Sequence, residues 1–467
     1  MFKRKIYTQL LNWKNKQSHK PLIIKGLRQI GKTTIVTKFA KDNYQSVITL
    51  DFRKDLSLNQ IFDGDFDIDE IIFALSLKYK TAKFVPYKTV LIFDELQDCP
   101  NARSSLKYFA LDGRYDIICT GSLLGIKNYR VTNKQSRGIP VGFEEMIEMK
   151  PMDFEEFLWA NSVNQEIIDT LYRSIRGNTK INDFIHERML DLFNKYICIG
   201  GMPEVVDIYI KTNNFNEVKK VQKRILMSFE SDFGTHLNDN YEIVSDENAR
   251  AKILSTFYSI PNQLAKDNQK FQYSTISKNA KARDYKSSVE WLENYGLISR
   301  CYNLTLPEIP FEFFKIEDSF KVFLNDTGLY IAMLEDNIPD LIINGKLKIA
   351  KGAIYENIVA ETFSKLGRKL YYYRKDSGLE IDFITEFNRQ PVLVEVKAKN
   401  GHTKSAKEIL ENKVKYNINT LIKLTANNIS RNQTVLNFPY YLTLFLFKSA
   451  DWISSFWHCE NHSNIAF

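Results

Sequence analysis

Residues 26–33 read Gly26-Leu27-Arg28-Gln29-Ile30-Gly31-Lys32-Thr33, which satisfies the pattern G-x-x-x-x-G-K-[ST] at every position. The apolar run before it, 21–25, predicts a buried parallel strand, and residues 34–40 can continue as a helix. Glycines let the backbone curl so that its N–H groups, together with the helix dipole, face an anion. The stretch therefore predicts a phosphate-binding loop in an α/β domain, and the alternative is a chance glycine turn before a helix.

The residue types in this loop predict a site for ATP and Mg²⁺. Lys32 would reach the β- and γ-phosphates, and the Thr33 hydroxyl would ligate the magnesium ion. The other residues expected to contact the nucleotide are Gly26, Leu27, Arg28, Gln29, Ile30, Gly31 and Thr34.

A second motif follows about 60 residues later, at 89–95, where an apolar run ends in Asp94-Glu95. Such a run is common by chance, but after a complete phosphate loop it predicts the strand that carries the magnesium-shell acid, here Asp94. Glu95 can polarise the attacking water as the base, which favours ATP hydrolysis over a GTP switch.

The strand expected at 116–122 should lie between the two motif strands and place a hydroxyl near the γ-phosphate. Thr120 and Ser122 are the candidates, and Ser122 is the choice. A plain strand followed by a turn is the alternative. One of four residues could stabilise phosphate charge, in cis or from a neighbouring subunit, and Arg137 is the candidate kept: Arg28, Gln29, Arg130 and Arg137.

Length and composition limit the number of domains, the class of partner and the cellular compartment. A chain of 467 residues with 44% hydrophobic and 26% charged residues predicts two to four globular domains. The net charge of +8 is compatible with nucleic acid without identifying it. Five scattered cysteines suit a reducing compartment. We expect a cytoplasmic protein, since no signal peptide or membrane-spanning apolar run is evident.

The middle of the chain has a helical pattern over 168–240, broken by Gly-Gly-Met-Pro at 200–203. From 248 to 303 the order is helix, short helix, helix and hairpin, which is the order of a winged helix. Basic residues gather at the start of the third helix, and they could contact the phosphates of duplex DNA: Lys278, Lys281, Arg283 and Lys286. A protein-contact module with a solvated charged face is the alternative.

The C-terminal part combines a helix at 352–366 that carries Glu356 with two strands, the first holding Asp382 and the second holding Glu395 and Lys397. Alternate residues on a strand face the same way, so Glu395 and Lys397 should meet. The set resembles the core of PD-(D/E)xK nucleases. That resemblance implies that Asp382, Glu395 and Glu356 ligate magnesium and that Lys397 orients or activates water. The alternative is a salt-bridged strand on a binding platform. The apolar run 438–447 predicts a last strand.

Several stretches together resemble one family of prokaryotic AAA-type ATPases, whose C-terminal domain of unknown function ends in a nuclease-like fold. The similar stretches are 21–34, 91–97, 119–125, 151–160, 200–204 and 325–329. The resemblance covers roughly 3–450 and implies ATP binding, ATP hydrolysis and a role in DNA transactions.

These observations predict an α/β protein built from a P-loop, AAA-type ATPase domain, a helical lid or connector, a winged-helix-like module and a restriction-endonuclease-like domain. The expected ranges are 1–160, 161–245, 246–320 and 321–450, with 451–467 an unplaced tail. The predicted function is ATP hydrolysis coupled to duplex DNA, in a possible homo-oligomer. The alternative is an ATP-dependent switch or scaffold for protein partners with an inactive nuclease-like domain.

Overall fold

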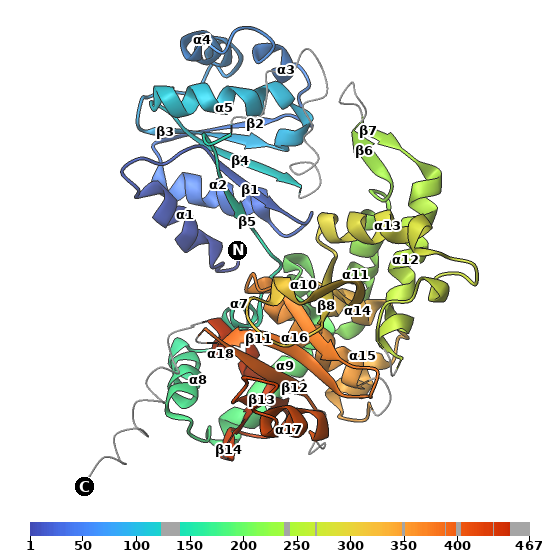
Figure 1. Ribbon diagram of the computed structural model, residues 1–467. Helices are drawn as coiled ribbons and strands as arrows, with labels where there is room; N and C mark the ends of the chain where they lie inside the picture. Colours follow the sequence, from blue (N-terminus) through green and yellow to red (C-terminus); the bar gives the residue numbers. More distant parts are fainter. Residues whose placement is uncertain are drawn as a thin grey trace. The chain divides into compact units, whose positions relative to one another are not determined.

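The computed structural model divides the chain into two compact units, each described here by itself (Figure 1). It describes residues 1–122, 141–237, 243–266, 269–347, 351–387, 389–397, 403–432 and 434–448. The first unit comprises Met1–Pro151, Ser228–Ile253 and Glu290–Gly296. The second comprises Met152–Met227, Leu254–Val289 and Leu297–Phe467.

The first unit is built on a five-stranded parallel sheet in the order β2-β3-β4-β1-β5. Its strands are β1 (Leu22–Gly26), β2 (Ser46–Asp51), β3 (Thr89–Asp94), β4 (Asp116–Ser122) and β5 (Glu145–Glu148). Every residue of β3 is buried, as expected for a central parallel strand covered on both faces. The prediction that β4 lies between the strands of the two motifs is confirmed, because β4 pairs with both β1 and β3.

Helices cover both faces of this sheet (Figure 1). Helices α1 (Ile6–Lys14) and α2 (Lys32–Asn43) lie on one face, and α4 (Ile68–Lys78) and α5 (Pro100–Asp112) lie on the other. The core includes Leu75, Leu106 and Phe93, all fully or almost fully buried. Short helices α3 (Leu58–Ile61) and η1 (Leu96–Asp98) connect these elements. The hairpin β6 (Thr235–Leu237) and β7 (Ile243–Ser245) also belongs to this unit.

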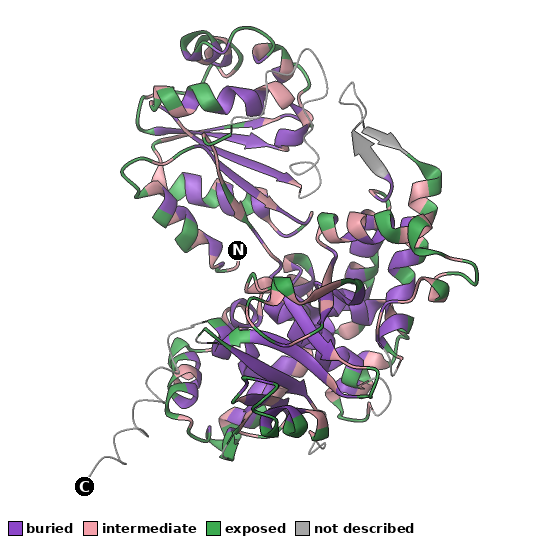
Figure 2. Cartoon of the chain, viewed as in Figure 1, coloured by how far each residue is buried: buried purple, intermediate pink, exposed green. Residues whose placement is uncertain are grey.

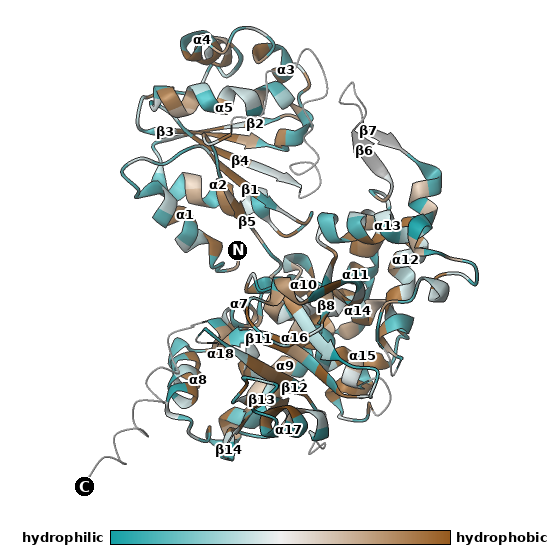
Figure 3. Ribbon diagram, in the orientation of Figure 1, coloured by the Kyte–Doolittle hydropathy of each residue, from teal (hydrophilic) through white to brown (hydrophobic). Residues whose placement is uncertain are grey.

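The second unit is built on an eight-stranded mixed sheet in the order β14-β15-β13-β12-β11-β10-β8-β9. Its strands are β8 (Ile298–Leu304), β9 (Lys315–Leu324), β10 (Leu370–Arg374), β11 (Glu380–Phe387), β12 (Gln390–Val396), β13 (Leu421–Thr425), β14 (Ser430–Asn432) and β15 (Val435–Pro439). The strands of both sheets are mostly buried (Figure 2) and apolar (Figure 3). Burial of apolar surface is therefore the main stabilising contribution in each unit.

Most of the remaining helices belong to the second unit. The helices of the middle of the chain are α7 (Phe154–Ala160), α8 (Gln165–Gly177), α9 (Asp183–Ile199), α10 (Pro203–Thr212), α11 (Phe215–Glu230), α12 (Glu247–Leu264), η2 (Tyr273–Thr275) and α13 (Ala282–Tyr295). Parts of α11, α12 and α13 belong to the first unit. The later ones are η3 (Phe311–Phe313), α14 (Thr327–Ala332), α15 (Ile338–Ile343), α16 (Lys351–Lys365), α17 (Lys404–Glu411), η4 (Tyr440–Leu442) and α18 (Thr443–Lys448). Among the described residues, none of the helices combines the length and the apolar character needed to cross a bilayer.

The break predicted at 200–203 is confirmed, since α9 ends at Ile199 and α10 begins at Pro203. Helix, 3-10 helix, helix and hairpin also follow one another as predicted over 248–303. The hairpin, however, is no separate wing. Strand β8 pairs in parallel with β10, so β8 and β9 extend the large sheet, and residue 320, the expected end of the winged-helix-like module, falls inside β9.

The strand predicted at 438–447 is wrong for most of its length. Only Phe438 and Pro439 lie in β15, and the chain then forms η4 and α18. All residues of η4 are buried, as are five of the six in α18. A run that is apolar at every position has no periodicity to distinguish a buried strand from a buried helix, so the pattern could not decide between them.

Candidate nucleotide-binding site and a second charged cluster

The phosphate loop joins β1 to α2 and needs its two glycines for different reasons. A Cβ on Gly26 would lie 2.4 Å from the Met149 carbonyl oxygen, so no larger residue fits there. Gly31, which precedes α2, has φ +86°, a left-handed conformation that favours glycine. Gln29 also has a positive φ of 62°. The predicted loop between strand and helix is thus present, with its backbone turned tightly.

Lys32 is the first residue of α2 and is buried with its loop. Its Nζ donates to the carbonyl oxygens of Gly26 at 3.0 Å and Leu27 at 2.8 Å. Burial lowers the Lys32 pKa to about 8, against the opposing attraction of Glu95. The Leu27 and Ile30 side chains are buried in the core, so both take part in packing the loop.

Asp94 joins the two motifs. Thr33 Oγ1 donates to Asp94 Oδ1 at 2.9 Å, and the buried Thr120 hydroxyl donates to the same oxygen. Of the two hydroxyls considered on β4, Thr120 is therefore the one in contact with the acid. Ser122 lies at the end of β4 in register with Gly26, beside the start of the loop, and its assignment to the γ-phosphate stays a prediction.

Glu95 follows β3 in a left-handed conformation, with φ 54° and ψ 51°. A non-glycine residue in this region is strained and is held by its surroundings. Arg53 lies 3.4 Å from Glu95 Oε2 and 2.9 Å from Asp98 Oδ2, and the Gln97 side-chain amide also donates to Glu95. Glu95, the carboxylate expected to activate water, is thus paired with Arg53, which follows β2. The sequence pattern did not indicate this pairing.

Arg28 makes a contact that no local pattern predicts. Its Nη1 pairs with Asp232 Oδ1, and the Tyr295 hydroxyl donates to the other oxygen of Asp232 at 2.6 Å. Gln29 Nε2 donates to Ser228 Oγ at 2.8 Å. All of these residues belong to the first unit, although about 200 positions separate the loop from its partners. Arg130 and Arg137 lie outside the described residues.

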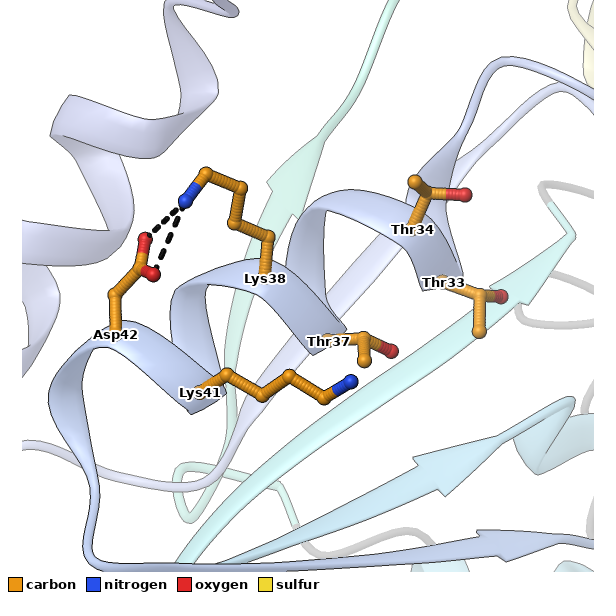
Figure 4. A pocket seen from close by; sticks show the side chains of 6 residues that line it. All are labelled: Thr33, Thr34, Thr37, Lys38, Lys41 and Asp42. Carbon is orange, nitrogen blue, oxygen red and sulfur yellow. Dashed lines mark hydrogen bonds and ion pairs between the residues drawn. The ribbon is translucent and has the colours of Figure 1, made fainter. Parts of the chain in front are cut away.

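The outer face of α2 forms a hollow of about 490 Å³ lined by Thr33, Thr34, Thr37, Lys38, Lys41 and Asp42 (Figure 4). Lys38 Nζ pairs with Asp42 Oδ2 at 2.7 Å, as expected one helical turn apart. Of the lining residues, Thr33 is the last residue of the phosphate-loop motif and Thr34 follows it in α2. The hollow is thus a polar extension along the helix that begins at the loop.

A second charged cluster, defined by Glu356, Asp382, Glu395, Lys397 and Lys321, lies in the second unit. Lys397 Nζ is 2.5 Å from Glu395 Oε2 and 3.2 Å from Asp382 Oδ2, which confirms that Glu395 and Lys397 meet. The Val396 N–H donates to Asp382 at 2.7 Å. Burial raises the pKa of Glu395 to about 8 and that of Glu356 to about 7, with Asp382 adding to both shifts.

Lys321 was not found from the sequence, because it lies on β9, outside the helix and the two strands that were expected to hold the cluster. It is 1% exposed, and its Nζ lies 3.0 Å from Glu380 Oε1 and 3.8 Å from Glu356 Oε2. A fully buried ammonium needs such partners to offset its desolvation. Lys321 therefore brings a second cation to Glu356, which the sequence associates with Lys397 alone, and links it to Glu380.

The fit of this cluster to a metal ion is mixed. Carboxylates suit Mg²⁺, and Glu356 Oε2 is a buried oxygen without a hydrogen-bond partner. In the described part of the chain, however, no group of three or more His, Cys, Asp or Glu side chains is placed to hold a metal ion. The contacts of Asp382 and Glu395 go to Lys397 instead.

Comparisons with protein families divide the chain into three matched regions. Residues 18–158 match the family described as "AAA domain". Residues 190–339 and 351–441 match two families described as domains of unknown function, DUF8612 and DUF4143. None of the curated proteins matches this chain. The N-terminal region is thus a P-loop, AAA-type domain, in agreement with the loop, the sheet order and the Thr33–Asp94 contact.

Solved structures resemble the chain only distantly. PCH-2 from C. elegans is 13% identical over 36% of this chain and 42% of its own, with a TM-score of 0.19. The RuvB Holliday junction branch migration motor of Thermotoga maritima is 12% identical over 64% and 90%, with a TM-score of 0.26. ORC1 of Aeropyrum pernix, in complex with DNA, is 10% identical over 71% and 90%, with a TM-score of 0.24. Superpositions at this level say nothing about what this chain binds.

Proposed function

We propose that the first unit binds and hydrolyses ATP. Lys32 would hold the β- and γ-phosphates and the loop backbone would cradle them, while Glu95 accepts a proton from the attacking water. Thr33 and Asp94 would hold the magnesium ion that accompanies the nucleotide, which would neutralise phosphate charge. To accept a proton, the Glu95 carboxylate must be accessible to water. Arg53 and Gln97 would therefore lose part of their contacts with Glu95 when ATP is bound.

One observation carries this proposal: the side chain of Thr33 reaches Asp94 at 2.9 Å. The hydroxyl and the carboxylate come from motifs 61 positions apart, yet they meet beside the buried Lys32. Threonine hydroxyl, aspartate and lysine at one loop are the donor set that a magnesium–triphosphate complex requires.

Steady-state ATP hydrolysis by the full chain tests the proposal, with Glu95→Gln as the variant. The wild type should turn over ATP, and Glu95→Gln should bind ATP with little change while losing at least about 100-fold in rate, the scale of a lost general base. A nucleotide that binds and is not hydrolysed by the wild type would reduce the function to ATP binding. No binding at all would refute it.

We extend the proposal to coupling between ATP hydrolysis and duplex DNA. Its support is the basic cluster near the start of α13, where four side chains are exposed: Lys278, Lys281, Arg283 and Lys286. Exposed cationic side chains near a helix start can contact DNA phosphates, whereas buried cationic side chains would be inaccessible to DNA. In this proposal DNA raises the hydrolysis rate.

Adding duplex DNA to the same assay tests this coupling, together with DNA affinity measured across salt concentrations. The double variant Lys281→Ala/Arg283→Ala should weaken binding uniformly across sequences and reduce the salt dependence by about two phosphate contacts. Lys180→Ala is a matched control outside the basic cluster, since Lys180 is also an exposed cation with an acidic partner, Asp183, as Arg283 has Asp284. A rate indifferent to DNA would refute the coupling.

For the second unit we propose a nuclease-like platform in which Asp382, Glu395 and Glu356 would hold a divalent ion and Lys397 would orient water. The buried Glu356 Oε2, which has no hydrogen-bond partner, supports it. Metal binding measured by calorimetry, compared with Asp382→Ala, tests the site, and cleavage of DNA is the second readout. If neither metal nor cleavage is detected, the cluster is structural.

The second candidate function is an ATP-dependent switch that acts on protein partners. It is favoured by the pairing of Lys397 with both Asp382 and Glu395, which satisfies those acids without a metal, and by the absorption of the β8–β9 hairpin into the large sheet. A robust, Glu95-dependent hydrolysis rate that DNA does not change would favour it. Under either function we propose a cytoplasmic protein, because Cys99, Cys119, Cys198 and Cys301 are free. Self-association into a homo-oligomer belongs to the proposal and is measured by sedimentation.

A further inference from the structure

We propose that Arg28 senses the γ-phosphate of ATP and that Asp232 is the anion with which the phosphate competes. The inference rests on the proposed nucleotide site and goes further, because it assigns a role to a carboxylate about 200 residues away in the chain. In the absence of a γ-phosphate, Arg28 pairs with Asp232. When ATP is present, the guanidinium is shared with or transferred to the phosphate.

The first support is the position of Arg28 inside the phosphate loop, two residues after Gly26 and four before Lys32. The Arg28 charge acts directly on Lys32, whose pKa it helps to lower. Two cations in one loop repel each other unless an anion lies beside them. Asp232 supplies that anion within the protein, and the terminal phosphate of ATP carries more negative charge than a carboxylate.

The second support is an unfilled donor. Arg28 Nε is buried and has no hydrogen-bond partner within the described part of the chain, although Nη1 is bound to Asp232. A guanidinium presents its donors in a fixed planar fork that matches phosphate oxygens two at a time. A buried charged donor without a partner is costly, so an incoming phosphate oxygen would relieve that cost.

The third support is the way Asp232 is held. The buried Tyr295 hydroxyl donates to Asp232 at 2.6 Å, and Tyr295 stacks on Trp291 and meets Phe229 edge to face. Trp291 in turn contacts Phe233. The competing carboxylate is thus fixed by an aromatic group and does not follow Arg28 when the guanidinium turns towards a phosphate.

Two helices, α11 and α13, end close to the Arg28–Asp232 ion pair, so a change in this pair would also affect them. Asp232 follows the end of α11 by two residues, and Tyr295 is the last residue of α13. The basic cluster lies near the other end of α13, which has 14 residues and is therefore about 21 Å long. Release of Arg28 by ATP would remove the ion pair of Asp232, the carboxylate that Tyr295 contacts from the end of the helix whose start lies near the proposed DNA contacts.

The test measures the affinity of the full chain for ATPγS and for ADP, both with Mg²⁺, and takes the ratio of the two dissociation constants. Asp232→Asn removes the competing charge and should shift the ratio about tenfold towards ATPγS, while ADP binding changes little. Tyr295→Phe keeps the charge of Asp232 and removes the hydroxyl that holds it, so it should not shift the ratio towards ATPγS. Arg28→Ala should shift it towards ADP, and in Arg28→Ala/Asp232→Asn the two effects should not add.

Asp112→Asn is the matched control, since Asp112 is also paired with an arginine of the first unit and is equally exposed, at 15% against 14% for Asp232. It should leave the ratio unchanged. Amide hydrogen exchange over 228–234 gives a second readout: ATPγS should raise exchange relative to ADP in the wild type but not in Arg28→Ala.

The outcomes separate the two proposals. If the wild type binds neither nucleotide, the proposed function is wrong. If both nucleotides bind and Asp232→Asn leaves the ratio unchanged, or shifts it towards ADP, the inference is overturned while the nucleotide site stands. Thermal unfolding of each variant establishes that the protein tested is folded.

Discussion

Single hydroxyl groups decide how Asp94 is held. Thr120 and Thr33 both donate to the same carboxylate oxygen, and Thr120 is fully buried. We predict that Thr120→Val, which keeps shape and loses the donor, lowers the ATP hydrolysis rate about tenfold and stability by about 1 kcal/mol, the usual value of one hydrogen bond. Ser122→Ala is the paired variant. A larger loss of rate in Ser122→Ala than in Thr120→Val would contradict this prediction and support the assignment of Ser122 to the γ-phosphate.

The buried ammonium of Lys321 is the other decisive single group. Its removal in Lys321→Met leaves Glu380 and Glu356 without their shared cation. We expect a loss of about 3 kcal/mol in the free energy of unfolding, since an uncompensated buried charge is costly. Lys397→Met should cost less, because Lys397 is 28% exposed and water can replace part of its contacts. Urea unfolding of both variants measures the difference, and equal losses would contradict it.

At the scale of elements, a buried acidic network joins α9, α14 and α16. Asp326 accepts from the N–H groups of Gly201 at 2.7 Å and Leu329 at 3.0 Å. The titratable groups around it are Glu361, Lys365 and Tyr196, and Glu361 accepts from the Thr327 N–H and from Lys365. Burial, reinforced by the Glu361 charge, raises the Asp326 pKa from 3.8 to about 6.

This network predicts a pH dependence with a defined sign. Between pH 4 and 6 the folded protein binds more protons at Asp326 than the unfolded chain does, so this contribution to stability falls as the pH rises through 6. Lowering the pH from 7 to 5 should therefore stabilise the wild type by about 1 kcal/mol relative to Asp326→Asn. Chemical unfolding of both proteins at the two pH values measures this difference. A difference independent of pH would contradict the prediction.

At the scale of the whole molecule, the chain enters the first unit three times, so a fragment ending at residue 160 keeps the sheet and loses 228–253 and 290–296. One hydrophobic core cluster of this unit lies wholly within residues 23–119. We predict that the fragment 1–160 unfolds cooperatively and, lacking Asp232, prefers ATPγS to ADP as Asp232→Asn does. Circular dichroism and nucleotide titration measure both properties. A fragment with wild-type discrimination would show that Asp232 has no part in it.

The same organisation explains what the sequence could predict. Lys32, Thr33, Asp94 and the place of β4 between β1 and β3 follow from local patterns in which spacing and secondary structure coincide. Arg53, Asp232 and Lys321 could not be found, because each reaches its site from an element whose own sequence has no motif. The hairpin at 298–324 has an ordinary hairpin pattern, and only its pairing with β10 decides that it belongs to the large sheet.

The glycines at 200, 201 and 328 leave no space for a side chain. A Cβ on Gly328 would lie 2.3 Å from the backbone of Ile199, one on Gly200 2.1 Å from Asp326, and one on Gly201 2.1 Å from the Met152 carbonyl oxygen. The segments 200–204 and 325–329 are thus two halves of a single joint within the second unit. Substitutions at these glycines would abolish every activity of that unit by preventing its assembly. Loss of activity in variants at these three glycines would therefore not show that the glycines belong to an active site.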